Sequence, residues 1–152
     1  MKASLLARLL CTAASLLSLA ASAAEVIDID GAQLAALSAS GVPVVDIRTA
    51  GEWAETGVVP GSRLLTFYDE KGRSDPVAWL AKLRAIAGPD RPVVVICRSG
   101  NRTKAVSRLL AGPGGYERVY NVRDGIRAWI GEGRPLADGT AALAACRADR
   151  SC

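Results

Sequence analysis

Residues 92–103 read Pro-Val-Val-Val-Ile-Cys-Arg-Ser-Gly-Asn-Arg-Thr, and this stretch decides the fold. Its β-branched run at 93–96 is typical of a strand that is buried on both faces. A helical pattern follows at 103–110. Cys97 is therefore predicted to lie at the end of a central strand, in a tight polar loop below a helix N-terminus. Loop amides and the positive end of the helix dipole favour an anion there, such as a thiolate, a persulfide or a substrate oxyanion.

The rest of the chain alternates between strand-like and helix-like stretches. This alternation predicts an α/β fold: one domain with a central parallel sheet of about five strands and helices on both faces. Ligands of such sheets bind beyond the carboxyl ends of the strands, where both Cys97 and Asp46-Ile47-Arg48 are placed. The predicted strands are 25–29, 42–47, 63–67, 93–96 and 118–122, and the predicted helices are 33–38, 49–55, 76–86, 103–110, 125–130 and 141–145.

The first 23 residues have the composition of a secretory signal peptide. Lys2 and Arg8 give a positive start, residues 9–20 form a short apolar run, and Ala21-Ser22-Ala23 offers the small residues that signal peptidase cleaves. We predict a signal peptide at 1–23 and a periplasmic or secreted mature protein without stable membrane association. The alternative is an uncleaved membrane anchor, which the shortness of the apolar run disfavours.

The remaining chain is long enough to form one hydrophobic core. We predict a single domain at 24–135 and an Ala-rich C-terminal tail at 136–152 that is partly helical. The full chain has a net charge of +4, and removal of Lys2 and Arg8 leaves +2. This mild charge is spread along the chain and aromatic residues are few, so no nucleic-acid partner is expected. We expect a monomer or a weak dimer.

Three cysteines follow the predicted cleavage site: Cys97, Cys146 and Cys152. Paired cysteines persist in the oxidising compartments that exported proteins reach. The spacing allows Cys146 and Cys152 to close a small ring, but also allows two free tail thiols or a bridge between chains. The intramolecular bridge would leave Cys97 as the odd thiol.

The chain contains no histidine. This excludes Cys-His and Ser-His pairs and removes the commonest zinc ligand. We expect no metal and no cofactor. Backbone dipoles and arginine charge must therefore activate Cys97.

Four segments, taken in order, carry a resemblance to a known family. They are Asp46-Ile47-Arg48 with Glu52-Trp53; Gly57-Val58-Val59-Pro60-Gly61-Ser62; the loop from Cys97 to Thr103; and Val119-Tyr120-Asn121-Val122 with Gly125 and Trp129. The ordered set resembles the rhodanese family of sulfurtransferases, in its small single-domain form, over about residues 25–135. The chain departs from that pattern at Val58 and Ser62, in an extra residue at Thr56, and at Asp124.

The resemblance implies sulfur transfer in two steps. The Cys97 thiolate takes a sulfane sulfur from a donor such as thiosulfate, and the resulting persulfide passes it to cyanide or a thiol. It further implies that the donor binds at Arg98, Ser99, Gly100, Asn101, Arg102 and Thr103, while Asp46 and Arg48 support the loop from a neighbouring strand end. We expect Trp53 and Trp129 to pack in the core rather than to bind substrate.

Two alternative functions come from other classes. Phosphatases that use a Cys-x5-Arg loop have one more residue between cysteine and arginine, and Thr103 fills that position here. The shorter loop from Cys97 to Arg102 suits a single sulfur atom. The second alternative is a rhodanese-like binding or redox-sensing module that carries a persulfide without turnover. The cysteine and both loop arginines favour the enzyme over this module.

Overall fold

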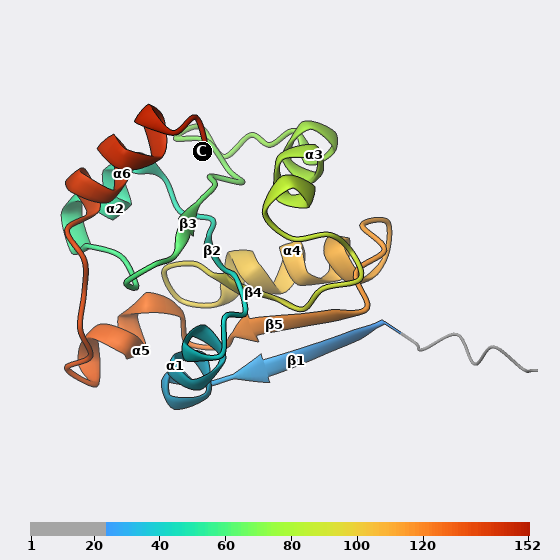
Figure 1. Cartoon of the computed structure of the whole chain (residues 1–152), viewed down its shortest axis with the longest axis horizontal. Coiled ribbons are helices and arrows are strands. Elements are labelled where there is room, and N and C mark those ends of the chain that lie inside the picture. The colour runs from blue at the N-terminus through green and yellow to red at the C-terminus, as the bar shows by residue number, and fades with distance from the viewer. Residues whose placement is uncertain (1–23) are drawn as a thin grey trace, which may run out of the picture.

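The protein's structure is a computed structural model that describes residues 24–152. The predicted signal peptide lies outside the described residues. In this part of the chain, five strands form one parallel sheet in the order β1-β5-β4-β2-β3, which confirms the predicted α/β architecture (Figure 1). The strands are β1 (Glu25–Ile29), β2 (Val44–Asp46), β3 (Arg63–Leu64), β4 (Val93–Ile96) and β5 (Arg118–Val122).

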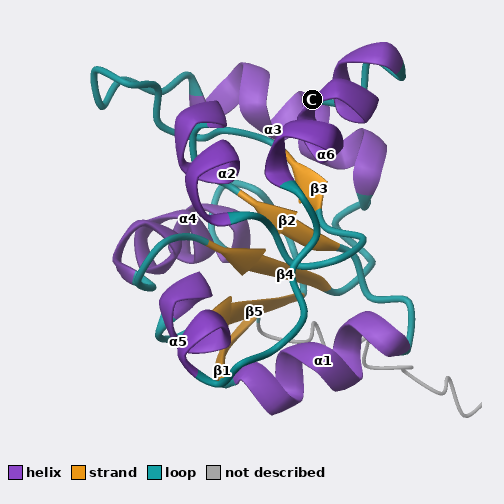
Figure 2. Cartoon of the chain, turned by 90° about the vertical axis from the view of Figure 1, so that its left-hand side faces the viewer, coloured by secondary structure: helices purple, strands orange, loops and turns teal. Residues whose placement is uncertain are grey.

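Within residues 24–152, six helices surround this sheet (Figure 2), and two pairs of them pack on its opposite faces. The helices are α1 (Gly31–Ala39), α2 (Ala50–Thr56), α3 (Pro76–Ile86), α4 (Asn101–Ala111), α5 (Gly125–Gly131) and α6 (Gly139–Ala148). Residues of α3 and α4 pack with Val93 and Val95, while residues of α1 and α5 pack with Val94 and Ile96. Because successive side chains of a strand point to opposite faces, β4 contributes equally to both cores.

Several helices begin after a residue whose side chain caps them. Asp30 and Gln33 form a reciprocal capping box at the start of α1, and Thr49 and Glu52 form another at the start of α2. The side chain of Asp75 accepts a hydrogen bond from the Ala78 amide, and Pro76 is the first residue of α3. These contacts satisfy amides that a helix cannot pair internally.

Two predicted strands are shorter in the structure, and each has a physical reason. β2 begins at Val44 rather than at residue 42, since Pro43 has no N–H to donate to a ladder. β3 covers Arg63–Leu64 rather than 63–67, because its partner β2 already ends at Asp46, before the turn into α2. In contrast, α4 begins at Asn101, two residues earlier than predicted.

The C-terminal tail forms α6 and packs against α2 and β3. Trp53, Val58, Leu64 and Cys146 form a small apolar cluster there. A Cβ on Gly139 would lie 1.7 Å from the carbonyl oxygen of Trp53, so this close approach requires glycine. The tail thus covers the edge of the sheet that β3 would otherwise expose.

The structure joins Cys146 and Cys152 in a disulfide and leaves Cys97 as a buried free cysteine. Trp53 and Trp129 are buried, in agreement with the expectation that both pack in the core. Within residues 24–152, no helix has the length and apolar character needed to cross a membrane.

We predict that Cys152→Ser lowers the free energy of unfolding by about 2 kcal/mol, because the bridge no longer restricts the unfolded chain. Urea unfolding of the oxidised wild type and variant measures this difference. A dithiol reductant should destabilise the wild type by the same amount and leave the variant unchanged. Alkylation of Cys97, Cys146 and Cys152 together in denatured, unreduced protein would contradict the bridge.

Candidate active site

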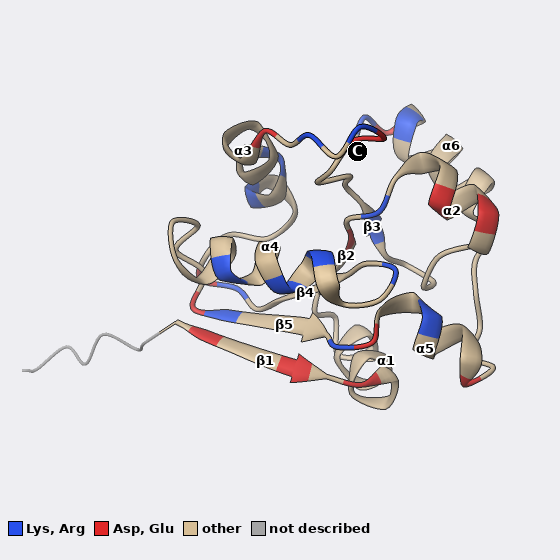
Figure 3. Cartoon of the chain, turned by 180° about the vertical axis from the view of Figure 1, so that it is seen from behind, with Lys and Arg blue, Asp and Glu red and all other residues tan. Residues whose placement is uncertain are grey.

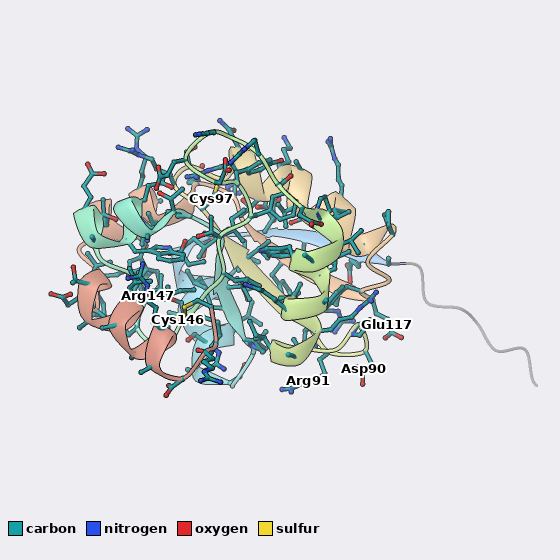
Figure 4. All side chains as sticks on the ribbon, turned by 90° about the horizontal axis from the view of Figure 1, so that it is seen from above. Asp90, Arg91, Cys97, Glu117, Cys146 and Arg147 are labelled. Atoms are coloured by element: carbon teal, nitrogen blue, oxygen red, sulfur yellow. A yellow bond between two sulfur atoms is a disulfide. The ribbon has the colours of Figure 1, made fainter. Side chains whose placement is uncertain are left out.

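Cys97 follows β4 directly, at the carboxyl edge of the sheet (Figure 4). The sulfur accepts the main-chain N–H of Gly100 at 3.2 Å and lies 3.5 Å from the hydroxyl of Thr103. The same hydroxyl donates to the carbonyl of Gly100 at 2.9 Å. Since a hydroxyl has one proton, Thr103 can donate either to that carbonyl or to the sulfur. One amide and one rotatable hydroxyl therefore face the sulfur.

The first turn of α5 is hydrogen-bonded to the loop from Cys97 to Thr103, which we call the cysteine loop. The amide of Ile126 donates to the carbonyl of Cys97 at 2.9 Å, and the amide of Arg127 donates to the carbonyl of Arg98 at 3.2 Å. In a trans peptide the N–H points opposite to the C=O, so the amides that follow these two carbonyls point away from α5. The first turn of α5 thus sets which way the amides of Arg98 and Ser99 face, and the Gly100 amide that reaches the sulfur belongs to the next peptide.

Glycine is required where the loop and α5 meet. Gly100 has a φ of 84°, and a Cβ on it would lie 1.8 Å from the carbonyl oxygen of Arg123. Gly125 has a φ of 63°, and a Cβ on it would lie 2.5 Å from the carbonyl group of Arg98. Any side chain at either position would push the loop away from α5.

Asp46 and Arg48, expected to support the loop, form a fully buried ion pair with an N–O distance of 2.7 Å. The guanidinium of Arg48 also donates to the hydroxyl of Thr56 at 2.6 Å and to the carbonyl of Gly57 at 2.8 Å. These partners belong to α2 and its C-cap. The pair therefore fixes α2, and its support of the cysteine loop is indirect.

Glu52 of α2 makes the direct connection to the loop. Its carboxylate accepts two hydrogen bonds from the guanidinium of Arg102, at 2.6 and 2.8 Å. It also accepts the amide of Thr49 at 3.0 Å. Burial acts to raise the pKa of Glu52, but these hydrogen bonds and the nearby positive charges outweigh it and hold the pKa below its ordinary value.

The sequence prediction did not include Glu52 among the site residues. Its spacing from Thr49 signals a capping box, and it lies in the Asp46…Glu52-Trp53 segment that carries the resemblance. Neither signal shows that its carboxylate reaches a residue 50 positions further along the chain.

The other predicted donor-binding residues differ in exposure. Arg98 and Asn101 are exposed, Ser99 is half-buried, and Thr103 is fully buried. Among residues 24–152, the Arg98 guanidinium has no hydrogen-bond or ion-pair partner, in contrast to that of Arg102. Basic residues continue from this loop along α4 (Figure 3). The cysteine loop therefore has one guanidinium held in an ion pair, that of Arg102, and one without such a partner, that of Arg98.

The described residues contain no cluster of three or more His, Cys, Asp or Glu side chains that could hold a metal ion. The arrangement instead resembles a covalent site, in which a thiol lies among main-chain donors and positive charge.

Residues 30–132 match the sequence profile of the Rhodanese-like domain, so the chain belongs to that family. It is similar to thiosulfate sulfurtransferase 18 of Arabidopsis thaliana, with 29% identity over 119 residues that cover 75% of this chain and 85% of the relative. It is 38% identical over 96 residues to a sulfurtransferase of Allochromatium vinosum, covering 62% of this chain and 78% of that one.

The fold is similar to that of a solved rhodanese-related protein from Thermoplasma volcanium. The TM-score is 0.55 with 27% sequence identity, and the match covers 74% of this chain and 98% of that one. Relatives and fold together place this chain among the sulfurtransferases.

We predict that Glu52→Gln lowers the free energy of unfolding at pH 7 by about 1 kcal/mol, since it removes a partly exposed ion pair. The glutamine oxygen still accepts the Thr49 amide, so the helix cap remains. Glu55→Gln is the matched control, because Glu55 is exposed on the same helix.

This difference depends on pH in a defined direction. Because the pKa of Glu52 is lowered in the folded protein, its stabilisation is complete above the ordinary value of 4.5 and is lost as the pH falls through the lowered value. The difference in free energy of unfolding between wild type and Glu52→Gln, measured in urea, should be smaller at about pH 3 than at pH 7. An equal difference at both pH values would show that the charge of the Glu52 carboxylate does not cause the stabilisation.

Proposed function

We propose that this protein transfers sulfur from thiosulfate, or a similar donor, through a persulfide on Cys97. The Cys97 thiolate attacks the outer sulfur of thiosulfate and forms a new S–S bond. The sulfur–sulfur bond of the donor breaks, and sulfite leaves with its electron pair. Cyanide or a thiolate then attacks the outer sulfur of the persulfide, which yields thiocyanate or a new persulfide and restores the Cys97 thiolate.

The contacts of the Cys97 sulfur carry this proposal. The Gly100 amide and the Thr103 hydroxyl, which approach it at 3.2 and 3.5 Å, can stabilise negative charge on the thiolate and on the leaving thiolate of the second step. Arg98 is free to contact the sulfonate oxygens of the donor, with a charge-assisted hydrogen bond of about 1.5–3 kcal/mol. Covalent transfer divides one displacement into two easier ones.

The other candidate is a binding or redox-sensing module that holds a persulfide without turnover. The burial of Cys97 favours this candidate, because a persulfide on a fully buried sulfur is shielded from acceptors until a local opening exposes it. The free guanidinium of Arg98 favours the enzyme, since repeated turnover requires a small anionic donor to bind again after each sulfur transfer.

An assay of thiosulfate with cyanide separates the two candidates. Wild type should release thiocyanate over many turnovers, while Cys97→Ser should release none above the uncatalysed rate, because serine cannot carry the sulfur. Stoichiometric release from wild type, ending after one turnover, would support the module. Equal turnover by wild type and Cys97→Ser would exclude both candidates.

In the same assay, Arg98→Ala should raise KM for thiosulfate about tenfold, which corresponds to one lost charge-assisted hydrogen bond of about 1.4 kcal/mol. The melting temperature should not change, since the side chain is exposed and has no partner among the described residues. Arg91→Ala is the matched control, because Arg91 is exposed and lies before β4, at the opposite edge of the sheet (Figure 4). An unchanged KM would remove Arg98 from the donor site.

We also propose that the protein is exported to the periplasm or secreted. The composition of residues 1–23 and the Cys146–Cys152 disulfide support this location, because disulfides persist in oxidising compartments. N-terminal sequencing of the protein from the exported fraction should give Ala24 or Glu25 as the first residue. A mature chain that still begins at Met1 would contradict cleavage.

A further inference from the structure

The surface beside the cysteine loop is basic. Residues 91–116, which contain β4, the cysteine loop and α4, include no Asp or Glu. Figure 3 shows Lys and Arg along α4 and on α5 on one side of the molecule. The exposed positions of α4 follow the spacing of a single helix face: Asn101, Lys104, Ala105 and Arg108.

Four exposed cations of this surface form no ion pair with any residue of 24–152. They are Arg98, Lys104, Arg108 and Arg127, which we call the basic face. The amide of Arg127 donates to the carbonyl of Arg98 at 3.2 Å, so α5 adjoins the cysteine loop. The basic face therefore extends from α4 across the cysteine loop to α5.

Carboxylates at the borders of the basic face already have other partners. Asp124, just before α5, pairs with Arg123 at 3.2 Å, and Asp28 of β1 accepts a hydrogen bond from Asn121 at 2.7 Å. The basic face thus keeps an excess of positive charge. Such a charge attracts an anionic partner over a Debye length, roughly 8 Å at physiological ionic strength.

The cations of α4 are placed against the stability of their own helix. Arg102 and Lys104 fall within its first four residues, where the positive end of the helix dipole disfavours a cation. Lys104 and Arg108 are four positions apart, so two like charges are neighbours on the helix surface. Natural proteins break such local rules mainly at functional sites.

The basic face is too long for a small sulfur donor. At 1.5 Å per residue, the main chain of Arg108 lies about 10 Å along α4 from that of Asn101. A thiosulfate at Cys97 cannot span this length, so Lys104 and Arg108 are available to a larger partner. Nucleic-acid bases stack on aromatic side chains, and lipid surfaces take up exposed apolar ones. The large apolar residues that the structure exposes lie outside α4 and the cysteine loop: Val26, Val77, Ile130 and Leu136.

We propose that the basic face docks an acidic polypeptide whose cysteine accepts the sulfur from Cys97. This rests on the sulfur transfer proposed above and adds the class of acceptor. Carboxylates of the polypeptide contact Lys104 and Arg108, and its thiolate attacks the outer sulfur of the Cys97 persulfide. A new S–S bond forms on the acceptor, the bond to Cys97 breaks, and Cys97 leaves as a thiolate. Exposed ion pairs are weak, so the acceptor can leave once it carries the sulfur.

Two matched peptides test docking apart from sulfur transfer. Each has a central serine, which cannot accept sulfur; one has glutamates on both sides and the other has glutamines. In fluorescence anisotropy at low salt, wild type and Cys97→Ser should bind the glutamate peptide equally, and more tightly than the glutamine peptide. Lys104→Gln/Arg108→Gln should weaken binding of the glutamate peptide about tenfold, the combined value of two exposed ion pairs.

The matched control is Arg63→Gln/Arg91→Gln. It removes the same charge from two exposed residues at the amino ends of β3 and β4, on the edge of the sheet opposite Cys97. Its affinity for the glutamate peptide should equal that of wild type. The double variant of α4 should melt no lower than wild type, because Lys104 and Arg108 have no ion-pair partner to lose.

The same peptides with a central cysteine test transfer. The ratio of kcat/KM for the glutamate peptide to that for the glutamine peptide should fall about tenfold in Lys104→Gln/Arg108→Gln. The ratio removes any difference in reactivity between the two peptide thiols. With cyanide as the acceptor, kcat/KM for thiosulfate should be the same in wild type and this variant.

Three results would overturn the proposal. The first is equal affinity of wild type for the glutamate and glutamine peptides, or equal affinity of wild type and the α4 variant for the glutamate peptide. The second is a lower kcat/KM for thiosulfate with cyanide in the α4 variant, because these charges would then serve the donor. The third is binding of phosphatidylglycerol vesicles through Lys104 and Arg108 without binding of the glutamate peptide. Docking of the glutamate peptide without sulfur transfer to any acceptor would contradict the proposed turnover and support the docking surface.

Discussion

The hydrogen bonds that α5 donates to the cysteine loop are the constraint on which the candidate site depends. They fix the carbonyls of Cys97 and Arg98, and thereby the direction of the amides beside them. Gly100 and Gly125 allow the close contact, because each has a positive φ and no room for a side chain. The loop is held by main-chain contacts, so its side chains remain available for chemistry.

A second support reaches the loop from the neighbouring strand. The buried pair of Asp46 and Arg48 holds α2 in place, and Glu52 of α2 holds Arg102. Removing one partner of a buried pair leaves an uncompensated charge, so the loss of either Asp46 or Arg48 would be strongly destabilising. Arg102 is thus positioned by the fold, whereas Arg98 extends into solvent. The two arginines of the loop have different roles despite their similar places in the sequence.

Local patterns were sufficient to predict the strands and helices that surround Cys97. The β-branched run of β4 and the caps at Asp30, Thr49 and Asp75 are local signals, and the structure contains each of them. The contact between Glu52 and Arg102 could not be predicted, because it depends on how α2 sits beside the loop. A cavity lined by α2, α3 and α6 is likewise a product of packing, since its wall combines segments from residue 50 to residue 152.

Mass spectrometry of the protein after incubation with thiosulfate tests the central claim most directly. The account predicts a gain of about 32 Da, the mass of one sulfur atom, on the peptide that contains Cys97, and its loss on addition of cyanide. An unchanged mass, or a gain confined to the peptide of Cys146 and Cys152, would contradict the assignment of Cys97 as the sulfur carrier.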